Sequence, residues 1–309
     1  MAMQRFRVAG HSMSPTLHPG QEVVTVDTRT PEPGDLVVFE HPGQAGMWLV
    51  KRLADRSGRI VSDNPDDSSN DSRTIGDVPI RSLLPIVERL DAETFVEGCE
   101  LLASEDEHLA ALVETWGIPE FWHRRPGFET LVLLILEQQV SLESGAAMYR
   151  RLTELTRVVT PEAVVAAGEQ DLRAIGVTRQ KTSYLLDLSE LVASGDLDLE
   201  RLDDLPTAEA RGELTRIRGI GAWTADAYLL SAQRRPDMWP VGDRALQVGT
   251  GEALGLSGVP TEADLELIGE PWRPVRAIAA RLIWHAYLGA RGRVEPPDPT
   301  HGHGTTGPA

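Results

Sequence analysis

The feature that most constrains this chain is a change in its hydrophobic pattern near residue 90. Before that point, short apolar runs such as QEVVTV, GDLVVFE and MWLVKRLA are separated by segments rich in Pro, Gly and Asp, a pattern that predicts β-strands. After it, long segments such as CELLASEDEHLAALVETW repeat apolar residues at helical spacing. With 309 residues, two folded units are expected. We predict a multidomain protein, with a small all-β domain over residues 1–90 and an all-α domain over residues 91–295.

The ends of the chain and its single cysteine suggest a cytoplasmic protein. No segment approaches the roughly 20 apolar residues of a membrane-spanning helix, and the N-terminus lacks the apolar core of a secretion signal. Cys99 alone can form neither an intrachain disulfide nor a clustered-thiolate metal site. Residues 296–309 offer almost nothing to bury, so we predict a disordered tail, in which His301 and His303 are solvated and hold no metal. We expect no cofactor, metal or membrane partner.

Charge is distributed unevenly along the chain. The formal net charge is −17. Residues 1–90 carry 10 Lys and Arg against 12 Asp and Glu, which leaves 20 against 35 in the remainder. An acidic surface slows encounter with DNA and weakens non-specific binding. If the helical domain binds DNA, we therefore expect a small, salt-sensitive footprint.

The segment LTRIRGIGAWTADAYLL, residues 214–230, predicts two helices joined by a tight turn. The first helix is expected to end at Arg218 and the second to begin at Ala222, with Gly219-Ile220-Gly221 between them. Two glycines allow the backbone to turn sharply while the central Ile220 packs between the helices. The free N–H groups at the start of the second helix can bind a phosphate without net positive charge. A plain connection between two helices is the alternative interpretation.

About twenty residues later, the segment MWPVGDRALQVGTGEAL places Asp243 after a Pro- and Gly-containing loop and before an amphipathic helix. An aspartate at this place commonly caps the helix. Capping and catalysis are compatible, because a carboxylate fixed at a helix start is held rigidly. Asp243 is therefore our candidate catalytic carboxylate.

Together with LILEQQVSLESGAAMYRRL, LRAIGVTRQKTSYL and EPWRPVRAIAARLIWHAYL, these motifs make residues 95–295 resemble a known family. It is the DNA-3-methyladenine glycosylase II branch of the helix-hairpin-helix base-excision repair superfamily. The resemblance implies a partner, double-stranded DNA with damaged bases, and a hydrolase that flips the damaged nucleotide out of the helix. It assigns Asp243 to stabilising the oxocarbenium-like sugar and assisting water attack at C1′.

The resemblance also implies roles for residues around Asp243. An N-alkylated purine is cationic, so aromatic faces suit it, and Trp223 and Trp239 are candidates for stacking; core packing is the alternative for both. Relatives that also cut the backbone carry a Schiff-base lysine where this chain has Trp223, which predicts a monofunctional enzyme. In related enzymes the turn corresponding to Gln138-Gln139 enters the minor groove, with Gln139 as the wedge. Arg244 departs from the apolar residue common in this branch, and either a phosphate contact or an effect on the Asp243 carboxylate would explain it.

The N-terminal segment VAGHSMSPTL places Ser12 in a turn limited by Gly10 and Pro15. Strand alternation puts Lys51, one of only two lysines in the chain, on an apolar face of its strand. Desolvation favours a neutral amine, which can act as general base to a serine. The alternative is a structural turn serine and a lysine that reaches solvent.

A third segment, SDNPDDSSNDSRTIGDVP, completes an ordered set of motifs by which residues 5–90 resemble the signal peptidase I superfamily. The likeness is greatest to the short, unanchored nickel superoxide dismutase maturation proteases, so a superoxide dismutase precursor is a possible protein partner. The resemblance implies Ser12 as nucleophile, Lys51 as base and the Ser12 backbone N–H in the oxyanion hole. It implies that Ser68 helps to orient the lysine and that Asp71 and Arg73 support the site. Two departures are a serine at position 62 in place of the usual glycine and one extra residue between positions 63 and 73.

Two different functions follow from these motifs. The first is a DNA glycosylase that excises alkylated bases of the 3-methyladenine type and carries a serine peptidase-like domain. The alternative is a protein whose main activity is proteolytic maturation or self-cleavage, with a DNA-binding helical domain that is not catalytic.

Overall fold

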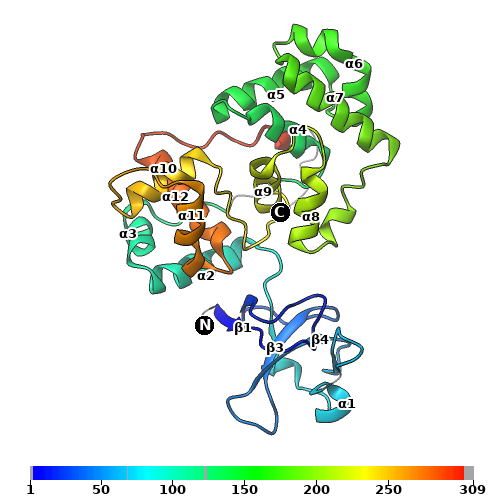
Figure 1. Ribbon diagram of the computed structural model, residues 1–309, viewed down its shortest axis with the longest axis vertical. Coiled ribbons are helices and arrows are strands. Elements are labelled where there is room, and N and C mark those ends of the chain that lie inside the picture. Colours follow the sequence, from blue (N-terminus) through cyan, green and yellow to red (C-terminus); the bar gives the residue numbers. More distant parts are fainter. Residues whose placement is uncertain (1–2, 68, 122–123, 303–309) are drawn as a thin grey trace.

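A computed structural model describes residues 3–67, 69–121 and 124–302. A small β unit, which contains the N-terminus, lies beneath a larger helical unit (Figure 1). The mixture of a β region followed by helices agrees with the expected fold class. None of the helices in the described segments is long and apolar enough to cross a membrane.

The β unit contains a two-stranded and a four-stranded antiparallel sheet. The first pairs β1 (Gln4–Arg7) with β2 (Glu22–Thr25), and the second has the order β5-β4-β3-β6. The strands of the second sheet are β3 (Leu36–Glu40), β4 (Trp48–Leu53), β5 (Ile60–Val61) and β6 (Leu84–Pro85), and a one-turn helix, α1 (Ser72–Ile75), precedes β6. Strand β3 is buried on both faces, because Val38 packs against Met13 and Leu17 while Val37 and Phe39 pack with Leu53 and Ile60.

The helical unit forms two lobes that lie side by side in Figure 1. One lobe is built around the contacts of α12 with α2, α3 and α10, and the other around the contacts of α4 with α5, α7 and α9. The first lobe contains α2 (Ala92–Glu105), α3 (Glu107–Trp116), α10 (Arg244–Ala253), α11 (Glu262–Gly269) and α12 (Arg276–Gly289). The second contains α4 (Phe128–Glu137), α5 (Leu142–Thr156), α6 (Pro161–Ala174), α7 (Arg179–Ser194), α8 (Thr207–Thr215) and α9 (Ala222–Ser231).

The β unit and the helical unit share a hydrophobic core. Met3, Val24, Val26 and Val87 belong to the same buried cluster as the core residues of the helices. Helix α2 approaches them closely at Gly98, where an added Cβ would lie 2.1 Å from the Ile278 side chain and 3.7 Å from that of Met3. The two units therefore pack together, and the expected domain boundary at residue 90 stays a prediction.

Arg5 adds polar contacts across the same junction. Its guanidinium donates to the Pro271 carbonyl at 3.2 Å and forms an ion pair with Glu105 at 3.0 Å. The junction is therefore both apolar and charged.

Two local predictions need correction. The helix before the glycine turn ends at Thr215, and residues 216–221 form the connection, so the expected end at Arg218 was three residues late. The expected disorder of residues 296–309 is wrong for residues 296–302. There, the 3-10 helix η4 (Pro299–Gly302) contacts α4 and α5, and Thr300 is buried. The Asp298 carboxylate accepts hydrogen bonds from the Thr300 N–H and hydroxyl, which organises this turn. His303 lies outside the described residues.

Candidate functional site

Asp243 lies at the start of α10, between the two helical lobes. It is the N-cap residue, and its Oδ1 accepts a hydrogen bond from the Leu246 N–H at 2.7 Å. The preceding loop is fixed by the Asp243 N–H, which donates to the Pro240 carbonyl at 2.8 Å, and by the Gln247 side chain, which donates to the Val241 carbonyl at 2.9 Å. The predicted cap is confirmed, and the carboxylate is held rigidly.

Two indoles complete the surroundings of this carboxylate. Trp223 Nε1 donates to Asp243 Oδ2 at 2.8 Å, and Trp284 Nε1 donates to Oδ1 at 3.0 Å. With the Leu246 N–H, three donors from α9, α10 and α12 surround one half-buried carboxylate. N–H donors favour the ionised form of a carboxylate. The site can therefore present a fixed negative charge to a cationic reacting centre.

Trp284 is a residue of the candidate site that the sequence did not indicate. It lies in the segment EPWRPVRAIAARLIWHAYL on α12, which is mostly buried. Its spacing on the helix is equally typical of a core tryptophan. The role becomes apparent only through the contact with Asp243, 41 residues away.

The predicted Gly219-Ile220-Gly221 turn joins α8 and α9 as expected. Gly219 has φ +88°, and an added Cβ there would lie 2.2 Å from the Tyr184 ring, so both backbone conformation and space require glycine. Ile220 is buried. Gly221 and Ala222 are exposed, and α9 has no side-chain cap. The first N–H groups of α9 are thus available to an external acceptor.

The two glutamines that follow α4 have different surroundings. Gln138 Nε2 donates to the Gly219 carbonyl at 2.8 Å and to Thr224 Oγ1 at 2.9 Å. Gln138 therefore braces the glycine turn, a role not expected from the sequence. Gln139 is exposed with φ +58°, so its side chain projects from the tip of the turn.

Trp239 does not belong to the site, and its proposed stacking role is corrected. The side chain is 5% exposed and its Nε1 donates to the Leu265 carbonyl at 2.9 Å. Its ring packs edge-on against Trp272 with centroids 5.4 Å apart. Trp239 is a core residue, since neither face is open to a base.

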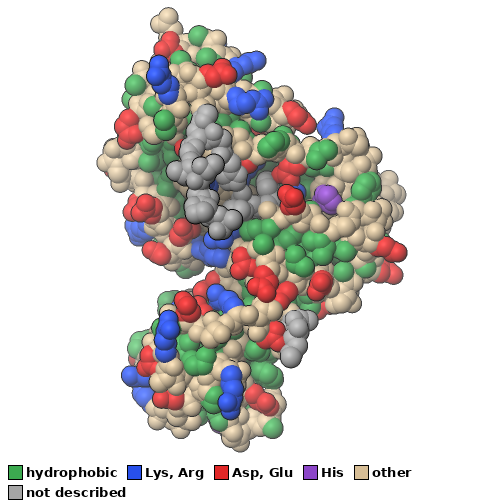
Figure 2. Space-filling view, turned by 180° about the vertical axis from the view of Figure 1, so that it is seen from behind, with side chains coloured by type: hydrophobic (Ala, Val, Ile, Leu, Met, Phe, Trp, Pro, Cys, Tyr) green, Lys and Arg blue, Asp and Glu red, His purple; other side chains and the backbone are tan. Residues whose placement is uncertain are grey.

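Two basic residues considered from the sequence, Arg244 and Lys181, bind groups other than the Asp243 carboxylate. Arg244 is exposed and donates to the Gln247 side chain at 3.3 Å. Lys181 donates to the Leu136 carbonyl at the end of α4, at 2.7 Å. Burial lowers the pKa of the Lys181 amine. On the face shown in Figure 2, basic and acidic side chains are interspersed without a broad basic area.

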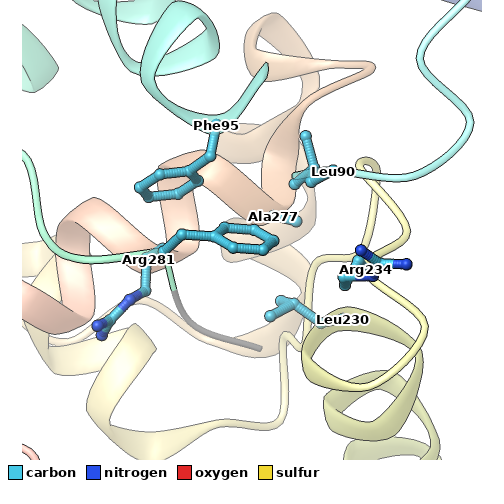
Figure 3. Close-up of a pocket in the computed structure, with 7 residues that line it drawn as sticks. Leu90, Phe95, Leu230, Arg234, Ala277 and Arg281 are labelled. Atoms are coloured by element: carbon cyan, nitrogen blue, oxygen red, sulfur yellow. The ribbon is translucent and has the colours of Figure 1, made fainter. Parts of the chain in front are cut away.

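A small cavity beside the junction of the two units has too little space for a substrate. It is lined by Leu90, Phe95, Phe121, Leu230, Arg234, Ala277 and Arg281 (Figure 3). Its volume of about 10 Å³ suffices for at most one water molecule.

In the β unit, Lys51 is buried in an apolar setting, as expected from strand alternation. The residue is 2% exposed, and its Nζ donates to Ser62 Oγ at 2.9 Å. Burial lowers the pKa of the Lys51 amine, an effect that the Asp67 and Asp71 carboxylates oppose. A lysine of this kind can act as a base.

The turn that carries Ser12 is attached to the segment after β5. The Asn64 N–H donates to the Ser12 carbonyl at 2.9 Å, and the Asn64 side chain donates to the His11 carbonyl at 3.1 Å. Thr16 Oγ1 also donates to Asp63 Oδ2 at 2.6 Å. These bonds bring the Ser12 turn to the strand end where Lys51 meets Ser62.

The expected support residues form a compact corner. Asp71 is fully buried, caps α1 and binds the Arg73 guanidinium through both carboxylate oxygens. The hydrogen bond from Arg73 holds the pKa of Asp71 below its usual value. Ser68 lies outside the described residues, so its expected role toward Lys51 stays a prediction.

Comparisons with known proteins match the two parts of the chain separately. Residues 132–274 match the family model of the HhH-GPD superfamily base excision DNA repair protein, and residues 1–62 match that of signal peptidase, peptidase S26. The second match is short and leaves the peptidase-like nature of the β unit a proposal.

Among individual proteins, the chain is 29% identical over 126 residues to the putative DNA-3-methyladenine glycosylase YfjP of Bacillus subtilis, covering 41% of this chain and 44% of that protein. It is 28% identical over 180 residues to the DNA-3-methyladenine glycosylase of the same organism, covering 54% and 57%. The chain thus spans about half the length of these two relatives.

A solved structure extends the comparison to the fold. The 3-methyladenine DNA glycosylase of Schizosaccharomyces pombe, in complex with abasic DNA, matches with a TM-score of 0.57 at 25% identity, covering 61% of this chain and 95% of that one. The matched region includes the glycine turn and Asp243 in the family model. The helical part of this chain has the fold of the helix-hairpin-helix DNA glycosylases.

Proposed function

We propose that the protein is a monofunctional DNA glycosylase that removes alkylated bases of the 3-methyladenine type from duplex DNA in base-excision repair. The observation that carries the proposal is the Asp243 carboxylate, which accepts hydrogen bonds from three N–H donors. One of these donors, the Trp223 indole, lies on α9, and this helix begins at the glycine turn without a side-chain cap. The ten-residue helix α9 therefore connects the Asp243 carboxylate with a helix start that can bind a phosphate.

The proposed chemistry is hydrolysis of the bond between C1′ and the base nitrogen. An N-alkylated purine leaves readily because it already carries positive charge, so the enzyme needs to stabilise the cationic sugar more than to protonate the base. The ionised Asp243 carboxylate supplies this stabilisation and assists the water that adds to C1′. Its three donors fix it in place, which reduces reorganisation during the reaction.

DNA would be held mainly through backbone amides. The first N–H groups of α9 offer a phosphate site that is independent of sequence. Gln139, at the tip of the turn after α4, is positioned to fill the space left by a flipped nucleotide. This mode of binding is compatible with the net charge of −17 and predicts affinity that falls with salt.

The absence of a suitable lysine supports the monofunctional assignment. Strand cleavage by Schiff-base chemistry needs a lysine amine at C1′. Trp223 stands at the position where related lyases carry that lysine, and its indole binds Asp243. The sequence holds two lysines, and Lys51 belongs to the β unit while Lys181 binds the end of α4.

One assay tests both parts of this proposal. Methylated duplex DNA is incubated with the protein, free base is measured by chromatography, and strand length is measured before and after alkali. We expect released 3-methyladenine, with breaks only after alkali. No released base would exclude the glycosylase, and breaks without alkali would exclude the monofunctional assignment.

A second function is proposed for the β unit, a serine peptidase with Ser12 as nucleophile and Lys51 as base. The observation that favours it is a lysine that is 2% exposed and that, among the described residues, binds a neutral hydroxyl and no carboxylate directly. Such an amine can accept the Ser12 proton. The test is phosphonylation of Ser12 by a serine-reactive fluorophosphonate, in which Oγ bonds to phosphorus and fluoride leaves, with Ser12→Ala as the control.

A further inference from the structure

The residue that opposes Lys51 across the sheet is fixed by the register of two strands. Strand β5 pairs antiparallel with β4, so that Ile60 faces Leu53 and Val61 faces Arg52. The next residue, Ser62, therefore lies opposite Lys51. Directly opposed side chains in a sheet lie on the same face, and Nζ accordingly donates to Ser62 Oγ at 2.9 Å.

We propose that Ser62 is a positioning residue of the Ser12–Lys51 site, an inference that rests on the peptidase proposed for the β unit. The Ser62 hydroxyl orients the Lys51 amine so that its lone pair remains free for the Ser12 proton. Ser62, which stands where the related peptidases usually have glycine, thereby has a chemical role.

The proton transfers explain why a hydroxyl at position 62 suits the Lys51 amine. A neutral amine has two N–H bonds and one lone pair, and an N–H committed to Ser62 restricts rotation about the Cε–Nζ bond. When Ser12 Oγ attacks a carbonyl carbon, its proton passes to Lys51 Nζ. The resulting ammonium then gives a proton to the nitrogen of the departing amine, while its bond to Ser62 persists.

The charges around the amine explain why its direct partner is neutral. Four charged groups act on Lys51 through space, and they are Asp63, Asp67, Asp71 and Arg73. The three carboxylates favour the ammonium, whereas burial, the largest influence, and the Arg73 guanidinium lower the pKa of the amine. A carboxylate at position 62 would add a direct charged partner and keep the lysine protonated. A hydroxyl orients the amine at a smaller cost to its basicity.

Ser62 also lies close to the nucleophile along the chain. Two residues after it, the Asn64 N–H binds the Ser12 carbonyl at 2.9 Å. The same short segment therefore places the serine turn and orients the base.

Lysine titration tests the contact without relying on activity. The sequence contains two lysines, so protein labelled with ¹³C at lysine Cε gives two NMR signals, and Lys51→Met assigns them. In Ser62→Ala the ammonium loses an acceptor, so we expect the Lys51 midpoint to move to lower pH, and Ser62→Thr to restore it. The matched control is Ser72→Ala, because Ser72 Oγ accepts from the Ile60 N–H at 2.8 Å without contacting Lys51.

Phosphonylation by the fluorophosphonate tests the functional role. Above the Lys51 midpoint, we expect Ser62→Ala to react about tenfold more slowly than wild type, because it loses one hydrogen bond of ordinary strength. Ser62→Thr should recover the rate. Equal titration and equal rates in Ser62→Ala and Ser72→Ala would overturn the role of Ser62. Wild-type labelling no faster than that of Ser12→Ala at every pH would instead overturn the peptidase itself, whatever the titration shows.

Discussion

The two proposed active sites surround their ionisable group with different partners. In the helical unit, the Asp243 carboxylate is half-buried and accepts from two indoles and one backbone N–H. In the β unit, the Lys51 amine is almost fully buried and binds one neutral hydroxyl directly. Three N–H donors take the place of water around the carboxylate, whereas the amine has one hydroxyl in place of water and burial lowers its pKa. The comparison teaches that the two sites differ in how fully the protein replaces the water lost from a charged group.

The sites also differ in how they are assembled. The partners of Asp243 come from α9, α10 and α12, which belong to both lobes of the helical unit. The described partner of Lys51, Ser62, directly follows the adjacent strand β5. The carboxylate site therefore depends on tertiary packing, while the lysine site depends on local strand register.

The largest effect is expected from removing the amine. Lys51→Met introduces an apolar side chain of similar length and removes the base, so the rate at which the fluorophosphonate labels Ser12 should fall by about 10²- to 10⁴-fold. Lys181→Met, which removes the other lysine, should leave this rate unchanged. In wild type the rate should rise with pH, because the base acts when deprotonated, and the lowered pKa of Lys51 should place the midpoint below the ordinary value of 10.5. If Lys51→Met reacted as fast as wild type, Lys51 would not be the base of the β-unit site, and the contrast between the two sites would be lost.

The next effect concerns the junction between the units. Met3 is 2% exposed in the shared core, so Met3→Ala should lower the free energy of unfolding by about 2–5 kcal/mol. Denaturant unfolding followed by far-UV circular dichroism and by tryptophan fluorescence should give one coincident transition. Val294→Ala, at a residue that is 86% exposed, is the control. Two separated transitions, with Met3→Ala affecting neither, would indicate that the units fold independently.

A smaller effect is expected from removing one donor to Asp243. Trp284→Phe retains most of the aromatic packing and loses the Nε1 hydrogen bond, which is worth about 1.5–3 kcal/mol to a charged group. Single-turnover base release should therefore slow by at least about tenfold. Trp48→Phe, on the exposed edge of the β unit, should have no effect. Equal rates for wild type and Trp284→Phe would show that the indole does not fix the carboxylate.

Local features of this fold were predictable from the sequence, and contacts between distant segments were not. The glycine turn at 219–221 and the capping position of Asp243 follow from backbone rules that act over a few residues. The apolar setting of Lys51 follows from strand alternation. The bond from Trp284 to Asp243 and the burial of Trp239 depend on how helices pack, and helical spacing alone does not distinguish a site residue from a core residue.

The order of residues 296–302 was missed for a related reason. Their composition suggested a solvated tail, but Thr300 is buried and η4 contacts α4 and α5, about 150 residues earlier in the chain. A segment with little apolar surface can be ordered when the rest of the protein supplies the packing surface and a local turn supplies hydrogen bonds, as Asp298 Oδ1 does for Thr300.

The central claim is that the Asp243 carboxylate performs the chemistry and does not merely cap a helix. Asp106 offers a matched control, because it caps α3 and its Oδ2 accepts from the Trp272 indole at 2.8 Å. Release of 3-methyladenine should be measured under single-turnover conditions for wild type, Asp243→Asn and Asp106→Asn, with thermal melting of each. We predict that Asp243→Asn slows release by about 100-fold or more while Asp106→Asn releases base at close to the wild-type rate. Equal release by Asp243→Asn and wild type would contradict the account.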